Sequence, residues 1–195
     1  MTKVAATLLC LLPLAAGAKE VTLFLQYEGT IDSIQGCRSC VGFKEGDAVS
    51  GVLRINPALA PSDRNPLPTR AEYGNQSDFT EISPNFVTGH ATGGKPNDFV
   101  SVVDERGTSQ VGSGSDSYGV RDSDGWGTRK YSQLTIFIQT SRNVIEGDGI
   151  AQAFDVAPEG NERFFGAIFQ RVKKGASEVY FNLTRVSLTP GSCRA

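Results

Sequence analysis

Residues 131–140 read YSQLTIFIQT, and this stretch decides the fold class. Leu134, Ile136 and Ile138 occupy alternate positions, and the residues between them are Thr, Phe and Gln. A period of two places successive side chains on opposite faces, which is the pattern of a β-strand with one buried face. We therefore expect a strand whose core side carries the three aliphatic residues.

Similar alternation recurs along the chain. Turns rich in Gly, Pro and Asp separate these runs, and no helical period lasts more than a few residues. The expected strands lie at 21–27, 47–56, 99–104, 131–140, 163–172 and 178–188. This pattern predicts an all-β protein with a single antiparallel β-sandwich or jelly-roll-like domain. Residues 57–76 and 108–127 are expected to be long loops, the second with a short edge strand around Tyr118 and Val120.

The first eighteen residues read as a targeting segment. Lys3 supplies a positive start, residues 4–14 are apolar apart from one Thr, and an Ala-Gly-Ala site ends at Ala18. This order is typical of a secretory signal peptide. We expect 1–18 to be removed and 19–195 to form one domain, secreted or periplasmic. No later run approaches the roughly 20 apolar residues of a membrane-spanning helix.

Composition argues against several classes of partner and chemistry. The formal net charge is −2 with both signs mixed along the chain, whereas nucleic-acid binding needs a dense basic patch. The single histidine, His90, stands among Gly and Thr, and we expect a solvated turn residue rather than a catalytic base. No G-x-S-x-G nucleophile motif occurs. Acid pairs at 45/47, 122/124 and 146/148 each accompany glycine in expected turns, where acids commonly form local hydrogen bonds. We expect no cofactor, with calcium as the one alternative.

Three cysteines follow the expected signal peptide. In an oxidising compartment two of them should pair. Cys37 and Cys40 could join within the first hairpin loop, or one of them could bridge to Cys193. The bridge to Cys193 closes the longer loop and, in the chain-entropy model, stabilises more. A structural disulfide is favoured over a redox pair, because strands rather than a helix N-terminus flank the two neighbouring cysteines.

The candidate ligand-binding residues lie in the polar stretch 116–127. Asp122 and Asp124 stand in an Asp-x-Asp-Gly turn that can offer oxygen ligands to calcium, although the closing Glu of an EF-hand is absent. Trp126 and Tyr118 lie nearby, and exposed aromatic rings beside acids are suited to sugar binding. These four residues form the candidate carbohydrate site, and the two acids form the candidate calcium site. The simpler interpretation is an ordinary polar loop with Trp126 folded over a sheet edge.

Two early stretches carry a family resemblance. Residues 27–34 read YEGTIDSI and 43–56 read FKEGDAVSGVLRIN. The pattern of these two stretches, together with 98–104 and the closing run 180–188, resembles that of small secreted bacterial proteins of the exosortase-sorted (PEP-CTERM) type. The resemblance implies a β-sandwich exported from a Gram-negative bacterium, and it implies no active residue. Because 189–195 lack the Pro-Glu-Pro box, apolar helix and basic tail, we expect a freely soluble protein.

Three functions follow from these observations. The first is an exported non-catalytic protein of structural, adhesive or surface/matrix character, with an extracellular polysaccharide or protein as partner. The second is a carbohydrate- or calcium-binding module that uses Tyr118, Asp122, Asp124 and Trp126. The third is a hydrolase with two carboxylates from separate strands. The first is favoured because the usual catalytic motifs are missing.

Overall fold

The computed structural model describes residues 21–40, 42–65, 67, 69–74, 80–82, 96–104, 115–124, 131–147, 149–172 and 175–192. Within these ranges all strand pairings are antiparallel, which confirms the all-β prediction. The elements are β1 (Val21–Gly36), η1 (Arg38–Cys40), β2 (Ala48–Ile55), β3 (Arg70–Gly74), β4 (Thr80–Ile82), β5 (Phe99–Val103), β6 (Asp116–Asp124), β7 (Tyr131–Thr140), β8 (Phe154–Val156), β9 (Arg163–Val172) and β10 (Gly175–Ser192). The expected signal peptide lies outside the described residues.

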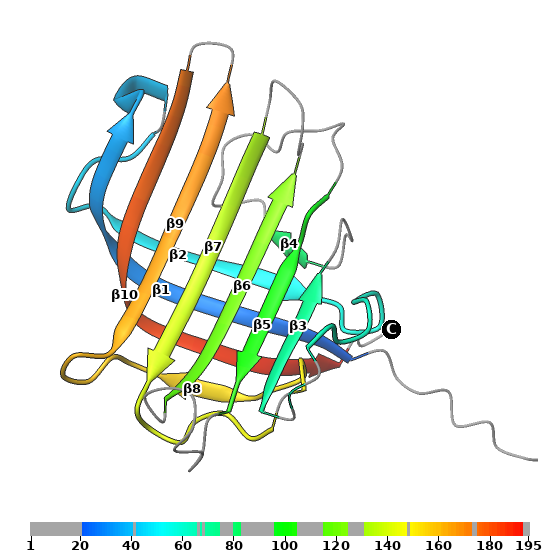
Figure 1. The fold of residues 1–195 in the computed structure, drawn as a ribbon. Coiled ribbons are helices and arrows are strands. Elements are labelled where there is room, and N and C mark those ends of the chain that lie inside the picture. Colours follow the sequence, from blue (N-terminus) through cyan, green and yellow to red (C-terminus); the bar gives the residue numbers. More distant parts are fainter. Residues whose placement is uncertain are drawn as a thin grey trace, which may run out of the picture.

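Hydrogen bonding joins the described strands into one sheet that does not close. Its order is β3-β5-β6-β7-β9-β10-β1-β2-β4, and β8 pairs with β10 off this path. Figure 1 shows the sheet bent, with β2 and β4 passing behind the strands from β9 to β3. We call β3, β5, β6, β7 and β9 the front half and β2, β4 and β8 the back half, while the long strands β1 and β10 belong to both. The finer prediction of a sandwich or jelly roll stays a prediction, because the strands share one hydrogen-bonded path.

The bend is associated with an irregularity in the pairing of β1 with β10. The register shifts between Glu28 and Gly29, and again two residues further on. Such bulges bend a strand and increase its twist. A Cβ at Gly29 would lie only 2.3 Å from the carbonyl oxygen of Asn182, so glycine allows the two backbones to approach closely here. Asn182 is also the last β10 residue paired with β9, and β8 takes over that edge at Val186–Leu188.

The hydrophobic core lies between the two halves. Leu134, Ile136 and Ile138 of β7 are at most 1% exposed, as their alternation predicts. On the neighbouring strands Phe181 covers Gly166, where an added Cβ would lie 2.1 Å from the ring. The ring of Tyr27 stacks on Phe181 with centroids 6.0 Å apart. Burial, and secondarily the charge of Asp122, raises the pKa of the Tyr27 phenol.

Two sequence expectations about loops were wrong. The proline-rich stretch 57–76 contains β3, which forms one end of the sheet. The stretch 108–127 contains β6, which is a central strand with β5 on one side and β7 on the other, rather than a short edge strand. Both segments are rich in residues that disfavour strands, so their local propensity predicted loops. Pairing with neighbouring strands nevertheless makes part of each segment a strand. Among the described residues, no helix has the length and apolar character needed to cross a bilayer.

Candidate functional site

Tyr118, a candidate sugar-binding residue, points into the core. Its side chain is 1% exposed, and its hydroxyl donates a hydrogen bond of 3.3 Å to the carbonyl oxygen of Ile150. The ring contacts Phe154 edge-on, with centroids 5.3 Å apart. Burial raises the pKa of the Tyr118 phenol. In this position the ring packs between the halves of the sheet and is closed to a surface ligand.

Asp122, the candidate calcium ligand, is 4% exposed and also faces inward. It accepts a hydrogen bond of 3.0 Å from the hydroxyl of Thr80 on β4. The backbone N–H of Thr80 donates to Asp98 at 2.8 Å, and Asp98 is 2% exposed. Thr80 therefore ties β4, one end of the sheet path, to β6 and to the start of β5 near the other end. Through these side-chain hydrogen bonds, the carboxylates of Asp98 and Asp122 connect strands of the bent sheet that are not backbone neighbours.

The rest of the candidate ligand-binding group is not placed. Trp126 and the side chain of Asp124 lie outside the described part of the chain. Among the described residues no cluster of three His, Cys, Asp or Glu side chains could hold a metal ion. The structure thus places Tyr118 and Asp122 on one strand with both side chains facing the core, and the calcium and carbohydrate assignments of the four residues stay predictions.

Cys37 directly follows β1 and is disulfide-bonded, but the side chains of both expected partners, Cys40 and Cys193, lie outside the described set. No disulfide therefore joins two described side chains, and the pairing stays a prediction. The backbone around Cys37 is held to β10, because its N–H donates to the carbonyl oxygen of Ala176 at 2.9 Å and its own carbonyl accepts from Ser177 at 2.7 Å.

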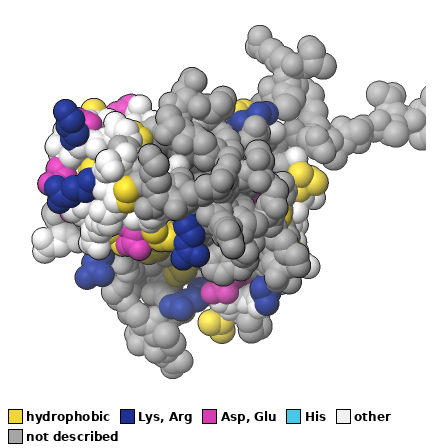
Figure 2. Space-filling view, turned by 90° about the horizontal axis from the view of Figure 1, so that it is seen from above, with side chains coloured by type: hydrophobic (Ala, Val, Ile, Leu, Met, Phe, Trp, Pro, Cys, Tyr) yellow, Lys and Arg dark blue, Asp and Glu magenta, His cyan; other side chains and the backbone are white. Residues whose placement is uncertain are grey.

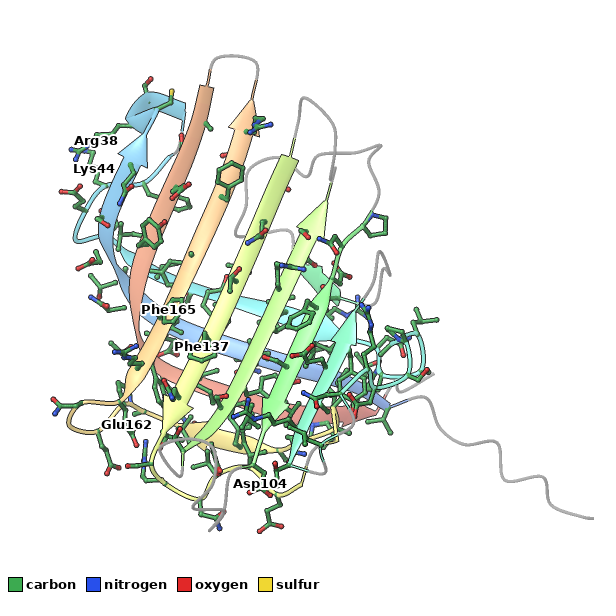
Figure 3. The ribbon with its side chains drawn as sticks, in the orientation of Figure 1. Arg38, Lys44, Asp104, Phe137, Glu162 and Phe165 are labelled. Atoms are coloured by element: carbon green, nitrogen blue, oxygen red, sulfur yellow. The ribbon has the colours of Figure 1, made fainter. Side chains whose placement is uncertain are left out.

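The hairpin loop between β1 and β2 offers a hollow of about 480 Å³ that is mixed in charge. Arg38 and Lys44 project outward from it (Figure 3). Arg38 pairs with Glu45 at 3.0 Å, and both side chains are well exposed. Figure 2 shows basic and acidic side chains interspersed over the described surface at this end of the molecule. Because opposite charges alternate among the described side chains here, those side chains give no field of one sign that would attract a charged ligand.

The outer face of the front half has a different character. Phe165 on β9 is 42% exposed, more than any other aromatic residue whose side chain the structure describes. Phe137, its direct partner on β7, lies beside it with ring centroids 5.2 Å apart (Figure 3). On β6 the next residue of this row is Gly119, where a Cβ would lie 3.2 Å from the Phe137 ring. The small residue leaves room for the ring, so the two phenylalanines form an accessible apolar patch on the outer side of the front half.

Polar and basic side chains surround this patch. Along β9, Arg163 and Arg171 are exposed and lie on the same face as Phe165. Arg121 on β6 places its guanidinium 5.4 Å from the centre of the Phe99 ring, where a cation is attracted to the aromatic face. The remaining described side chains on this side of β6, β7 and β9 are uncharged: Ser117 and Ser123, which are buried, and Gln133, Thr135, Gln139, Ala167 and Phe169. We call this set, with Phe137 and Phe165, the arginine–phenylalanine face.

Sequence reasoning missed the arginine–phenylalanine face, although it predicted the strands that carry it. In 163–172, read RFFGAIFQRV, phenylalanine occurs on both faces, so the alternation does not say which side is buried. Pairing with β7 and β10 turns Phe164 inward and Phe165 outward. The signal available in the sequence was that apolar residues occur on both faces of this strand, so that one of the two faces must leave an apolar residue outside the core. No family model, no curated protein and no solved structure matches this chain.

Proposed function

We propose that the chain is an exported, non-catalytic binding protein of adhesive or surface/matrix character, secreted or periplasmic. The observation that carries this proposal is the exposed Phe165, paired with Phe137, on a sheet face that also holds amides and arginines. An accessible aromatic patch rimmed by polar groups is typical of a recognition surface. We further propose that the bent sheet works as a sandwich, with the facing halves forming a rigid support for this surface.

The buried acids support a non-catalytic role. Asp98 and Asp122 accept hydrogen bonds from Thr80, and Asp116 accepts from the backbone N–H groups of Val144 and Ile145 at 2.8 and 3.0 Å. Asp98 and Asp122 hold the segment at Thr80, and Asp116 holds the segment at 144–145, against the sheet. A carboxylate engaged in this way stabilises the fold and is poorly placed to exchange protons with a substrate.

The test is to measure retention of the protein on immobilised extracellular polymers, both polysaccharides and matrix proteins. We expect Phe165→Ala to weaken retention by about tenfold, because a central aromatic anchor commonly carries much of the binding energy. Phe24→Ala is the matched control, since Phe24 is a partly exposed phenylalanine on the outer side of β1 in the back half. If Phe165→Ala and Phe137→Ala both bind every polymer as the wild type does, the proposed surface is wrong.

A further inference from the structure

We propose that the arginine–phenylalanine face binds an acidic polysaccharide, one whose sugars carry carboxylate groups. This inference rests on the proposed function and adds the chemical class of the ligand. The protein as a whole has a formal net charge of −2, so a local surplus of arginine needs its own explanation. The described side chains that point outward from β6, β7 and β9 include Arg121, Arg163 and Arg171 and no carboxylate.

Acidic residues of the described part of the chain lie around the margins of this face, where Glu159 and Glu162 line one hollow with Arg163. Glu72 lies on β3, beyond β5, and Glu178 lies on β10, where it accepts a hydrogen bond of 2.5 Å from the Tyr180 hydroxyl. The back half is organised differently, because Arg185 on β10 forms an ion pair of 2.5 Å with Asp155 on β8. Arg185 and Asp155 of the back half are therefore paired, while the described outward-pointing side chains of β6, β7 and β9 carry positive charge alone. This asymmetry is complementary to an anionic ligand.

Rings, amides and guanidinium groups together match the chemistry of an acidic sugar chain. Phenylalanine rings can pack against the apolar C–H faces of sugar rings, and glutamine side chains can both donate and accept hydrogen bonds with hydroxyl groups. A guanidinium group binds a carboxylate through two parallel hydrogen bonds. Arg163 and Arg171 stand eight residues apart on one strand, about 27 Å at the usual rise of an extended chain. A ligand that reaches both must be extended, as a polysaccharide is.

The edge beside this face is closed to a protein strand. The backbone N–H of Glu72, which points away from β5, donates to the carboxylate of Asp63 at 2.8 Å, and its carbonyl accepts from the N–H of Arg64 at 3.1 Å. The carbonyl of Gly74 accepts from the Arg64 side chain at 3.3 Å. Hydrogen bonds with Asp63 also lower the pKa of that carboxyl. Because β3 already has these partners, strand addition is blocked there, and a ligand of the front half meets side chains instead.

The experiment compares four immobilised polymers by affinity electrophoresis at two salt concentrations. Polygalacturonate carries a carboxylate on each sugar, dextran is a neutral polysaccharide, poly-glutamate is a polyanion without sugar rings, and dextran sulfate is a sulfated polysaccharide. We expect the protein to bind polygalacturonate in preference to the other three. The double variant Arg163→Gln/Arg171→Gln should bind polygalacturonate about tenfold more weakly, and the retention should fall as salt is raised. The control is Arg185→Gln, which removes one positive charge from the back half and should bind as the wild type does.

Each outcome decides between the two proposals. Equal binding of dextran and polygalacturonate, or wild-type binding by the double variant, overturns the acidic-polysaccharide inference while a loss on Phe165→Ala still supports a binding surface. Equal binding of poly-glutamate and polygalacturonate would show that the protein does not recognise the sugar rings. Electrostatic attraction to a polyanion would then explain the binding. Stronger binding of dextran sulfate than of polygalacturonate would overturn the proposal that the ligand's acidic groups are carboxylates. If neither phenylalanine variant alters binding to any polymer, both the inference and the proposed function fail.

Discussion

The charge of Glu162 should stabilise the fold in a pH-dependent way. Glu162 precedes β9, its side chain is 7% exposed, and it meets Arg142 from the segment after β7 at 2.6 Å. The hydroxyl of Thr140 and the backbone N–H of Glu159 also donate to it. Burial alone would raise the pKa of this carboxyl, but these hydrogen bonds and the positive charge of Arg142 lower it from 4.5 to about 2. Figure 3 shows Glu162 at the end of the molecule opposite Arg38.

The magnitude follows from the difference between the pKa values of the folded and unfolded states. A carboxyl whose folded pKa is lowered contributes stability that is complete above its unfolded pKa and disappears as the pH falls through its folded pKa. At 1.36 kcal/mol per pKa unit, a lowering of that size corresponds to about 3 kcal/mol. Arg142 is 32% exposed, so solvent screens part of the attraction. We therefore expect Glu162→Gln to lower the free energy of unfolding by roughly 1–2 kcal/mol at pH 7.

The assay is urea unfolding of wild type and Glu162→Gln at pH 7, 4, 3 and 2. The difference in unfolding free energy should shrink between pH 4.5 and pH 2, because the wild-type carboxyl becomes protonated over that range. The control is Asp155→Asn, which breaks the ion pair with Arg185. Both of those side chains are more than half exposed, so we expect little change despite the short distance of 2.5 Å. A Glu162→Gln penalty that is absent at pH 7, or is equally large at pH 2, would refute the reasoning.

Two further predictions concern the bend and the tie between the ends of the sheet. Gly29→Ala should lower the free energy of unfolding by about 1–3 kcal/mol, because its Cβ would overlap the backbone of Asn182, whereas Gly149→Ala meets no atom closer than 3.9 Å and should be nearly neutral. Equal urea midpoints for the two variants would contradict this. Thr80→Val keeps the side-chain shape but removes a hydrogen bond to the buried Asp122, and should cost about 1–3 kcal/mol; an unchanged midpoint would mean that the tie contributes nothing.

The sequence by itself determined which faces of the most regular strands are buried. In β7, the aliphatic residues at 134, 136 and 138 point into the core and Phe137 points outward, as their period of two predicts. Val179, Phe181 and Leu183 of β10 are buried for the same reason. Successive side chains of an extended chain point to opposite faces, and this holds regardless of which strands lie next to it. All-β class and antiparallel pairing could be predicted on this basis.

Only the tertiary structure decided the burial of the polar strand β6 and the orientation of β9. Asp116 and Asp122 read as loop residues, since buried carboxylates are costly without partners. Their donors come from elsewhere in the chain, from the backbone at 144–145 and from Thr80, and become available only when the sheet bends. Phe165 likewise became a surface residue because its neighbours turn the other face of β9 toward the core. Such contacts between distant segments depend on the order and curvature of the strands, which no local pattern encodes.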